Sequence, residues 1–147
     1  MAKIVAGMGT SHVPGVGAAM DNGKTGEDYW KPLFEGLVPL RKWHAENVPD
    51  VNIIVFNDHA TSYSLNNYST FTVGVGERFK PADEGWGARQ VPDMRGSPEL
   101  AWHIVECLMA DEFDMAVVAD VDLDHGLTVP LSICLLYTSD AADETER

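Results

Sequence analysis

The sequence predicts an α/β fold, with a mostly parallel sheet and helices on both faces. Three observations predict this class. Short apolar runs rich in β-branched residues alternate along the chain with segments of helical spacing. The clearest run, Val51–Asn57, is almost continuously apolar, as strands covered on both faces are. With 147 residues, of which 45% are hydrophobic, the chain fits one soluble domain, assigned to residues 1–136.

The first half of the chain predicts two strands separated by a helical stretch. Ile4–Gly7 is a short apolar run that indicates a buried strand, and a glycine-rich loop follows it. Residues 27–46 carry apolar side chains at spacings of three and four, which predicts helix. Pro39 lies inside that stretch and lacks a main-chain N–H, so we expect either a kink or two shorter helices. Val51–Asn57 is the second strand.

The second half predicts a strand, a long loop, a helix and a further strand. Phe71–Val75 is the strand, and residues 78–95 are the loop, because they are rich in Pro and Gly. A helix begins at Ser97-Pro98, since serine caps helix N-termini and proline is favoured at the first helical position. Residues 114–119 form the last strand. The buried stripe of the helix is Leu100, Ile104 and Leu108.

Charge and composition exclude several classes of partner. The chain has 10 Lys and Arg against 23 Asp and Glu, a net charge of −13, which disfavours nucleic-acid phosphates and anionic membrane surfaces. No apolar run approaches the ~20 residues of a membrane span. Met1–Gly7 lacks the longer apolar core of a secretory signal, and two cysteines are too few for a disulfide framework. We therefore expect a cytoplasmic protein.

The end of the chain, residues 137–147, differs in composition from the rest. It contains no aliphatic residue larger than alanine. The string from Leu135 to Glu144 resembles translated adapter or vector sequence. We interpret residues 137–147 as a non-native read-through tail, and the alternative is a genuine acidic tail.

Three of the five histidines occupy the same kind of position. His12, His59 and His125 each follow a predicted strand. Ligands of open α/β sheets bind beyond the carboxyl ends of the strands, so parallel strands would gather these imidazoles at one edge. Neutral imidazole binds Zn, Fe, Cu and Ni, and two histidines with one carboxylate form the facial triad of non-haem Fe(II) oxygenases. The alternative for each histidine is a surface or hydrogen-bonding role.

Other motifs in the chain are incomplete. Gly7–His12 begins like a dinucleotide-binding loop but has histidine where the third glycine belongs. Asp120–Gly126 begins like a calcium loop, but its glycine comes one residue late, and Leu131 stands where glutamate is needed. Its aspartates are expected to border a site or to face solvent. His44 and His103 fall in helical segments, and we interpret them as ordinary helix histidines.

Several strings, taken together, give the chain a resemblance to a known family. They are Ser11-His12, Asn57-Asp58-His59, Asp124-His125-Gly126, Phe79–Gly87, Leu100–Ile104, Asp111–Met115 and Thr128–Ser132. Over about residues 1–134 the chain resembles the class III extradiol ring-cleavage dioxygenases. Within that class it is most similar to the catalytic β subunits of protocatechuate 4,5-dioxygenases. Gallate dioxygenases share several of the same strings.

The resemblance implies a non-haem Fe(II) enzyme that opens the ring of protocatechuate with O₂, by meta-cleavage, in the breakdown of lignin-derived aromatics. It implies that His12 and His59 are two of three Fe(II) ligands, and that His125 is a catalytic histidine near the substrate hydroxyl and O₂. The third ligand, a glutamate, and a second catalytic histidine lie further along in the family than this chain extends. We therefore expect an amino-terminal part with a sheet incomplete at the C-terminus and no activity by itself.

Partners, substrate and two residue roles stay open at this stage. The resemblance implies a small helical α subunit, a homo-oligomer or both, and gallate or 3-O-methylgallate is the alternative substrate to protocatechuate. From the residues alone, Asn57 either contacts substrate or ends its strand. Asp58 either orients a ligand imidazole or caps the following turn. Two functions of other classes are a non-enzymatic interaction module of the same fold and a zinc hydrolase using the same histidines.

Overall fold

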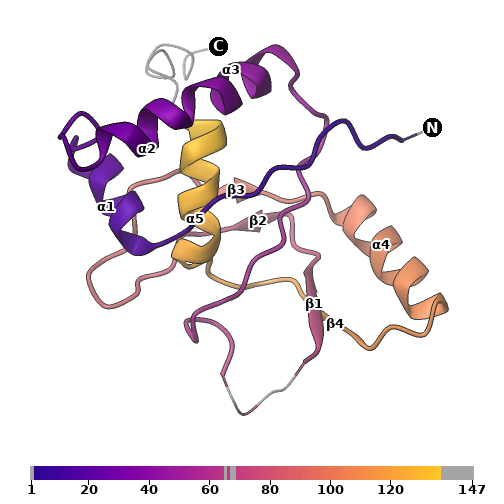
Figure 1. The fold of residues 1–147 in the computed structure, drawn as a ribbon. Coiled ribbons are helices and arrows are strands. Elements are labelled where there is room, and N and C mark those ends of the chain that lie inside the picture. The colour runs from indigo at the N-terminus through magenta and orange to yellow at the C-terminus, as the bar shows by residue number, and fades with distance from the viewer. Residues whose placement is uncertain (1, 65, 67–68, 137–147) are drawn as a thin grey trace. The chain divides into compact units, whose positions relative to one another are not determined.

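The computed structural model describes residues 2–64, 66 and 69–136, in which three helices come first along the chain and the strands lie in its second half, together with a further helix before and after the last strand (Figure 1). The chain forms two compact units. The helical unit comprises Met1–Phe56 and His125–Arg147, and the sheet unit comprises Asn57–Asp124. The predicted read-through tail, residues 137–147, lies outside the described residues.

Two separate helices replace one long helix in the first half of the helical unit. The stretch predicted over residues 27–46 breaks at Leu37, and Pro39 is the second residue of the helix that follows. The first N–H groups of a helix have no partner within it, so proline costs no hydrogen bond there. The prediction of two shorter helices is confirmed. The elements of this unit are α1 (Pro14–Asp21), α2 (Lys31–Gly36), α3 (Val38–Glu46), α5 (His125–Leu131) and the π-helical η1 (Ser132–Leu136).

The core of the helical unit lies between its helices. Helix α1 packs against α5, and α3 packs against η1. Val129 and Ile133, at 0% and 1% exposure, are at the centre of this core. Because α5 begins at His125, its packing on α1 fixes where that histidine lies within the unit. The buried cluster consists of Val16, Ala19, Met20, Phe34, Val129 and Ile133, with Trp30, Leu37, Leu40 and Cys134 packed against it.

A parallel strand pair and one helix organise the sheet unit. Strand β1 (Phe71–Gly74) pairs in parallel with β4 (Met115–Val118). Helix α4 (Pro98–Ala110) lies between them in the sequence and packs against both strands. Parallel strands need such a crossover, and a helix is the usual one. The predicted α/β class with a parallel sheet is thus confirmed.

Helix α4 begins where the sequence predicts. Ser97 is its N-cap residue, followed by Pro98, although the Ser97 side chain makes no capping hydrogen bond. The predicted stripe faces inward but is only half-buried, and Val105, at 2% exposure, is the residue that packs most deeply. A helix covering a narrow two-stranded sheet buries one line of side chains fully and the flanking lines partly.

Among the residues that the structure describes, none of the helices has the length and apolar character that a membrane span requires.

The segment predicted as a plain loop, residues 78–95, is closed at its base by a short antiparallel pair. Strands β2 (Arg78–Phe79) and β3 (Met94–Arg95) pair there. Next to them, a Cβ added to Gly96 would lie 2.1 Å from the carbonyl oxygen of Gly76. Only glycine allows main chains to approach so closely. The sequence prediction missed these strands because two residues are too few to show a period.

Two strand predictions are wrong. Residues 4–7 and 51–57 are all described, and neither segment forms a strand. Ile4 is 94% exposed and Val55 is 93% exposed, so the expected burial on both faces is absent too. β-branched residues favour an extended main chain, but a strand also requires a hydrogen-bonded neighbour, which residue type does not specify. No described strand pairs with either segment.

Candidate metal-binding site

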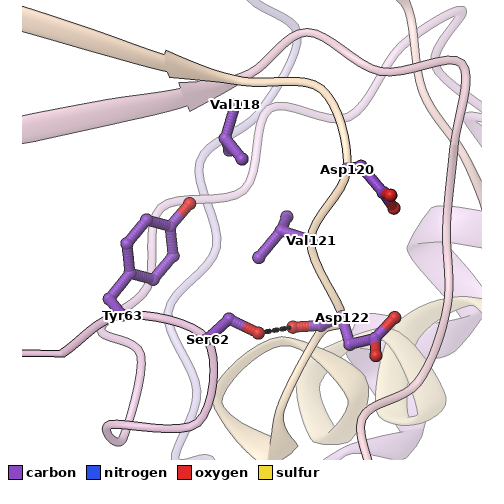
Figure 2. Close-up of a pocket in the computed structure, with 6 residues that line it drawn as sticks. All are labelled: Ser62, Tyr63, Val118, Asp120, Val121 and Asp122. Carbon is purple, nitrogen blue, oxygen red and sulfur yellow. Dashed lines mark hydrogen bonds between the residues drawn. The ribbon is translucent and has the colours of Figure 1, made fainter.

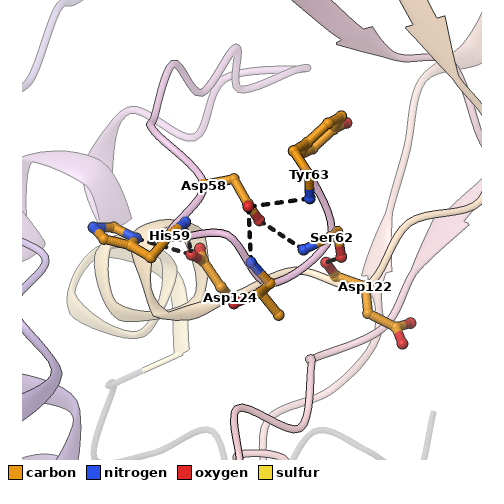
Figure 3. Close-up of polar contacts among 7 residues, drawn as sticks. Asp58, His59, Ser62, Tyr63, Asp122 and Asp124 are labelled. Atoms are coloured by element: carbon orange, nitrogen blue, oxygen red, sulfur yellow. Dashed lines mark hydrogen bonds and ion pairs between the residues drawn. The ribbon is translucent and has the colours of Figure 1, made fainter. Parts of the chain in front are cut away.

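A buried aspartate holds one of the predicted ligand histidines. The side chain of Asp124 has no exposed surface, whereas that of His59 is 39% exposed. The Oδ2 atom of Asp124 accepts a hydrogen bond from the main-chain N–H of His59 at 2.7 Å. The same oxygen lies 2.8 Å from His59 Nδ1 (Figure 3). The imidazole is thus tied to a fixed carboxylate on its Nδ1 side.

Asp58 shapes the turn that follows His59. Its Oδ2 accepts hydrogen bonds from the main-chain N–H groups of Thr61, at 3.0 Å, and Tyr63, at 3.2 Å. Its Oδ1 accepts one from Ser62 N–H at 3.3 Å. Of the two roles considered from the sequence, the structure shows the turn-capping one. The carboxylate that contacts the His59 ring belongs to Asp124 instead.

The segment that carries Asp124 is held from two directions. On one side, the Ser62 hydroxyl donates to the carbonyl oxygen of Asp122 at 2.6 Å. On the other side, Leu123 N–H donates to Lys80 O at 2.7 Å, and Leu123 O accepts from Ala82 N–H at 2.9 Å. Successive residues of an extended segment point in opposite directions, so Asp122 and Leu123 can bond to different neighbouring segments.

His12 and His125 are neighbours within the helical unit. Their ring centroids lie 6.1 Å apart, with the ring planes inclined by 42°. His125 is the first residue of α5 and is only 8% exposed, while His12 is half-buried two residues before α1. The structure therefore brings His12 to His125 in the helical unit, and His59 to Asp124 in the sheet unit.

Sequence reasoning placed Asp124 only among aspartates that border a site or face solvent. Its position could have singled it out, because it directly precedes His125 in the loop after a predicted strand. Asn57 is exposed and is the first residue of the sheet unit. A contact between Asn57 and substrate stays a prediction. His44 and His103 lie in helices α3 and α4, in agreement with their interpretation as helix histidines.

A small cavity lies beyond the C-terminal end of β4, where ligands of parallel sheets commonly bind (Figure 2). Its volume is about 290 Å³. Burial raises the pKa of the Tyr63 hydroxyl in this cavity, and the negative charge of Asp58 raises it further. The two carboxylates of the cavity disfavour an anionic ligand. The lining residues are Ser62, Tyr63, Val118, Asp120, Val121 and Asp122.

Comparison with known protein families settles the family of this chain. Residues 6–140 match the family described as the catalytic LigB subunit of aromatic ring-opening dioxygenase. The chain belongs to the LigB family. This membership confirms the dioxygenase class that the histidine-containing strings indicated. It also agrees with the α/β fold with parallel strands described above.

A curated relative of this LigB chain is similar over a shorter stretch. Gallate dioxygenase of Pseudomonas putida is 48% identical to it over 54 residues. The aligned stretch is 37% of this chain and 16% of the relative. The chain thus spans about a sixth of the length of that enzyme in this comparison. Gallate was the alternative substrate inferred from the sequence.

Proposed function

We propose that this chain is part of the catalytic subunit of an Fe(II)-dependent extradiol dioxygenase that opens the ring of protocatechuate with O₂. Membership of the LigB family supports the reaction class. The structural observation that supports a metal ligand is the His59–Asp124 contact, at 2.8 Å from Nδ1 to Oδ2. Histidines that bind metals almost always donate their second ring N–H to a carboxylate, a carbonyl oxygen or water.

His12 and His59 are the proposed Fe(II) ligands from this chain. Imidazole is a suitable ligand for iron, and two imidazoles leave room for a carboxylate, the substrate and O₂. The Asp124 carboxylate engages His59 at Nδ1, so Nε2 is the atom available to the metal. The donor set of these residues therefore fits Fe(II). When bound, Fe(II) brings the catecholic substrate and O₂ together and passes electrons between them.

His125 is the proposed catalytic residue. It is 8% exposed, and its ring lies beside that of His12. A histidine with little access to water can accept a proton from a substrate hydroxyl and return it to an oxygen atom later in the reaction. We propose that Asn57 contacts the substrate, and that Asp58 caps the turn after His59 through the main-chain N–H groups of that turn, without contacting the metal or the substrate. The remaining ligand, a glutamate, and a second catalytic histidine are proposed to lie outside these 147 residues.

The test is oxygen consumption by the complete subunit, expressed from the full gene and loaded with Fe(II) without air. We expect uptake of one O₂ for each protocatechuate, with both labelled oxygen atoms found in the ring-opened product. The 147-residue chain assayed in parallel should show no turnover. A complete subunit that holds iron but consumes no O₂ with any catecholic acid contradicts the proposal and favours an interaction module. Zn²⁺-dependent activity without O₂ would indicate a hydrolase.

Gallate is the second candidate substrate, because the curated relative is a gallate dioxygenase. Gallate carries one more ring hydroxyl than protocatechuate. A pocket built to hydrogen-bond a hydroxyl strongly rejects a ligand that lacks it. We expect kcat/KM to differ more than about 100-fold between the two acids. For 3-O-methylgallate, we expect kcat/KM to be closer to that of the preferred acid than to that of the other acid. The preferred acid identifies the substrate.

Cytoplasmic location and the partner subunit are part of the same proposal. We propose that the complete subunit assembles with a small helical α subunit or with a second copy of itself. Size-exclusion chromatography of the subunit, alone and with the product of a neighbouring gene, distinguishes these assemblies. A monomer that is fully active alone contradicts both.

A further inference from the structure

We propose that Asp124 is the positioning residue for His59, holding the imidazole so that its Nε2 atom is presented to a bound metal ion. This inference rests on the proposed function, because it takes His59 as a metal ligand. It assigns a role to a carboxylate that sequence reasoning did not select, and it concerns groups within the sheet unit.

One oxygen atom of Asp124 holds His59 at two points. Oδ2 accepts from the main-chain N–H at 2.7 Å and contacts ring Nδ1 at 2.8 Å. One contact fixes the main chain at His59 and the other fixes the ring. Because the main-chain N–H and the ring Nδ1 of His59 both contact the same oxygen atom, the two side-chain torsions of His59 have little freedom. A ligand held in advance loses less conformational entropy when it binds a metal.

The contact also selects the tautomer of His59. An ionised carboxylate has only acceptor capacity, so the hydrogen atom between the groups belongs to Nδ1. In neutral imidazole the other nitrogen then carries the lone pair, and this nitrogen is Nε2.

Asp124 can do this because it is itself immobile. Its side chain has no exposed surface. The residue before it, Leu123, is bonded through both N–H and carbonyl groups to the segment 80–82. Two residues before it, Asp122 accepts from Ser62 at 2.6 Å, which ties the same segment to the turn after His59. The carboxylate is therefore fixed relative to the histidine that it orients.

Asp58 provides the matched control. It is the other carboxylate next to His59, and its oxygens accept hydrogen bonds from the main chain of Thr61, Ser62 and Tyr63. Asp58→Asn removes the same charge at nearly the same place, and the Asp58 carboxylate bonds the turn and not the His59 ring. A purely electrostatic effect on His59 would appear in both variants. A positioning effect appears only when Asp124 is changed.

The first measurement is the tautomer of His59 in the metal-free 147-residue chain, by NMR of ¹⁵N-labelled histidine. We expect the Nδ1–H form in the unchanged chain and in Asp58→Asn. In Asp124→Ala we expect a mixture of both forms. A His59 that is in the Nε2–H form in the unchanged chain overturns the inference directly, without any variant.

The second measurement is the affinity of the complete subunit for Fe(II), and for Co²⁺ as a spectroscopic probe. We expect Asp124→Ala to weaken metal binding about 100-fold and Asp124→Asn about 10-fold, because asparagine keeps an acceptor but not the charge. Asp58→Asn should change it less than about 3-fold. The Co²⁺ absorption bands should shift in the Asp124 variants alone. Equal losses in Asp58→Asn and Asp124→Asn overturn the inference.

Two further outcomes separate this inference from the proposed function. If the subunit binds iron and opens the ring, but Asp124 variants bind iron normally, only the inference is wrong. If the unchanged subunit binds no metal, the proposed function fails with it, and the tautomer measurement then reports a purely structural contact. Asp124→Asn is isosteric with aspartate, so it keeps the comparison possible if Asp124→Ala does not fold.

Discussion

The rings of His12 and His125 lie 6.1 Å apart, centroid to centroid, within one compact unit. The two residues are 113 positions apart in the sequence. Packing of α1 on α5 brings them together, since His12 lies just before α1 and His125 is the first residue of α5. Asp124, the residue before His125, contacts His59. The Asp124-His125 dipeptide therefore contributes one contact to each of the two proposed iron ligands.

Loss of either proposed ligand should abolish iron retention. In the complete subunit, His12→Ala or His59→Ala is expected to lower Fe(II) affinity by more than about 100-fold, because losing a ligand costs more than losing its supporting partner. The measurement is iron content after gel filtration without air. His103→Ala is the control, since His103 is exposed on α4. Iron retained at wild-type level in both ligand variants would exclude this pair as ligands.

His125 should matter for turnover but not for iron. His125→Ala is expected to keep full iron content and to lower kcat by about 10²–10⁴-fold, the usual contribution of a general acid or base. The readouts are iron content and the rate of O₂ uptake at saturating substrate. His44→Ala serves as a comparison, because His44 is also buried but lies in α3. A His125→Ala enzyme with unchanged kcat contradicts the catalytic assignment.

Tyr63 should make stability decline at alkaline pH. Burial and the Asp58 charge raise the pKa of Tyr63 above its ordinary value of 10.0. When pH rises past that value, the unfolded chain loses the Tyr63 proton first, so unfolding becomes easier until the folded pKa is reached. The contribution is fully present below pH 10.0 and is lost above it.

The corresponding measurement is urea unfolding between neutral and strongly alkaline pH. Tyr63→Phe should flatten the decline above pH 10.0. Tyr29→Phe, at an 81% exposed position, should leave it unchanged. If the free energy of unfolding declines equally with pH in the unchanged chain and in Tyr63→Phe, the pKa of Tyr63 is not raised in the folded protein.

The core of the helical unit should depend on Ile133. Ile133→Ala is expected to lower the free energy of unfolding by about 2–5 kcal/mol, because the side chain is 1% exposed and leaves a cavity. Ile4→Ala is the matched control: the same substitution at a 94% exposed site should change it by less than about 0.5 kcal/mol. Urea midpoints provide both values. A large loss for Ile4→Ala would mean that the first apolar segment is packed after all.

Local rules predicted the elements whose signal lies within a few residues. Pro39 predicted the division into α2 and α3, and Ser97-Pro98 predicted the start of α4. The runs that form β1 and β4 were also predicted as strands of a mostly parallel sheet, but their pairing with each other was not predicted and comes from the structure. Residues 4–7 and 51–57 were mispredicted, since strand formation depends on a neighbouring strand as well as on residue type.

Residue patterns were enough to predict the α/β class, the break near Pro39 and the histidines on which the proposed chemistry depends. Only the three-dimensional structure shows which groups each carboxylate bonds. Asp58 accepts hydrogen bonds from the turn that follows it, whereas Asp124, 65 residues along the chain from His59, contacts the His59 ring. The reason is physical. Turn caps and helix starts depend on torsions and hydrogen bonds between adjacent residues. A contact between distant residues depends on how whole segments pack, and short sequence patterns do not specify that.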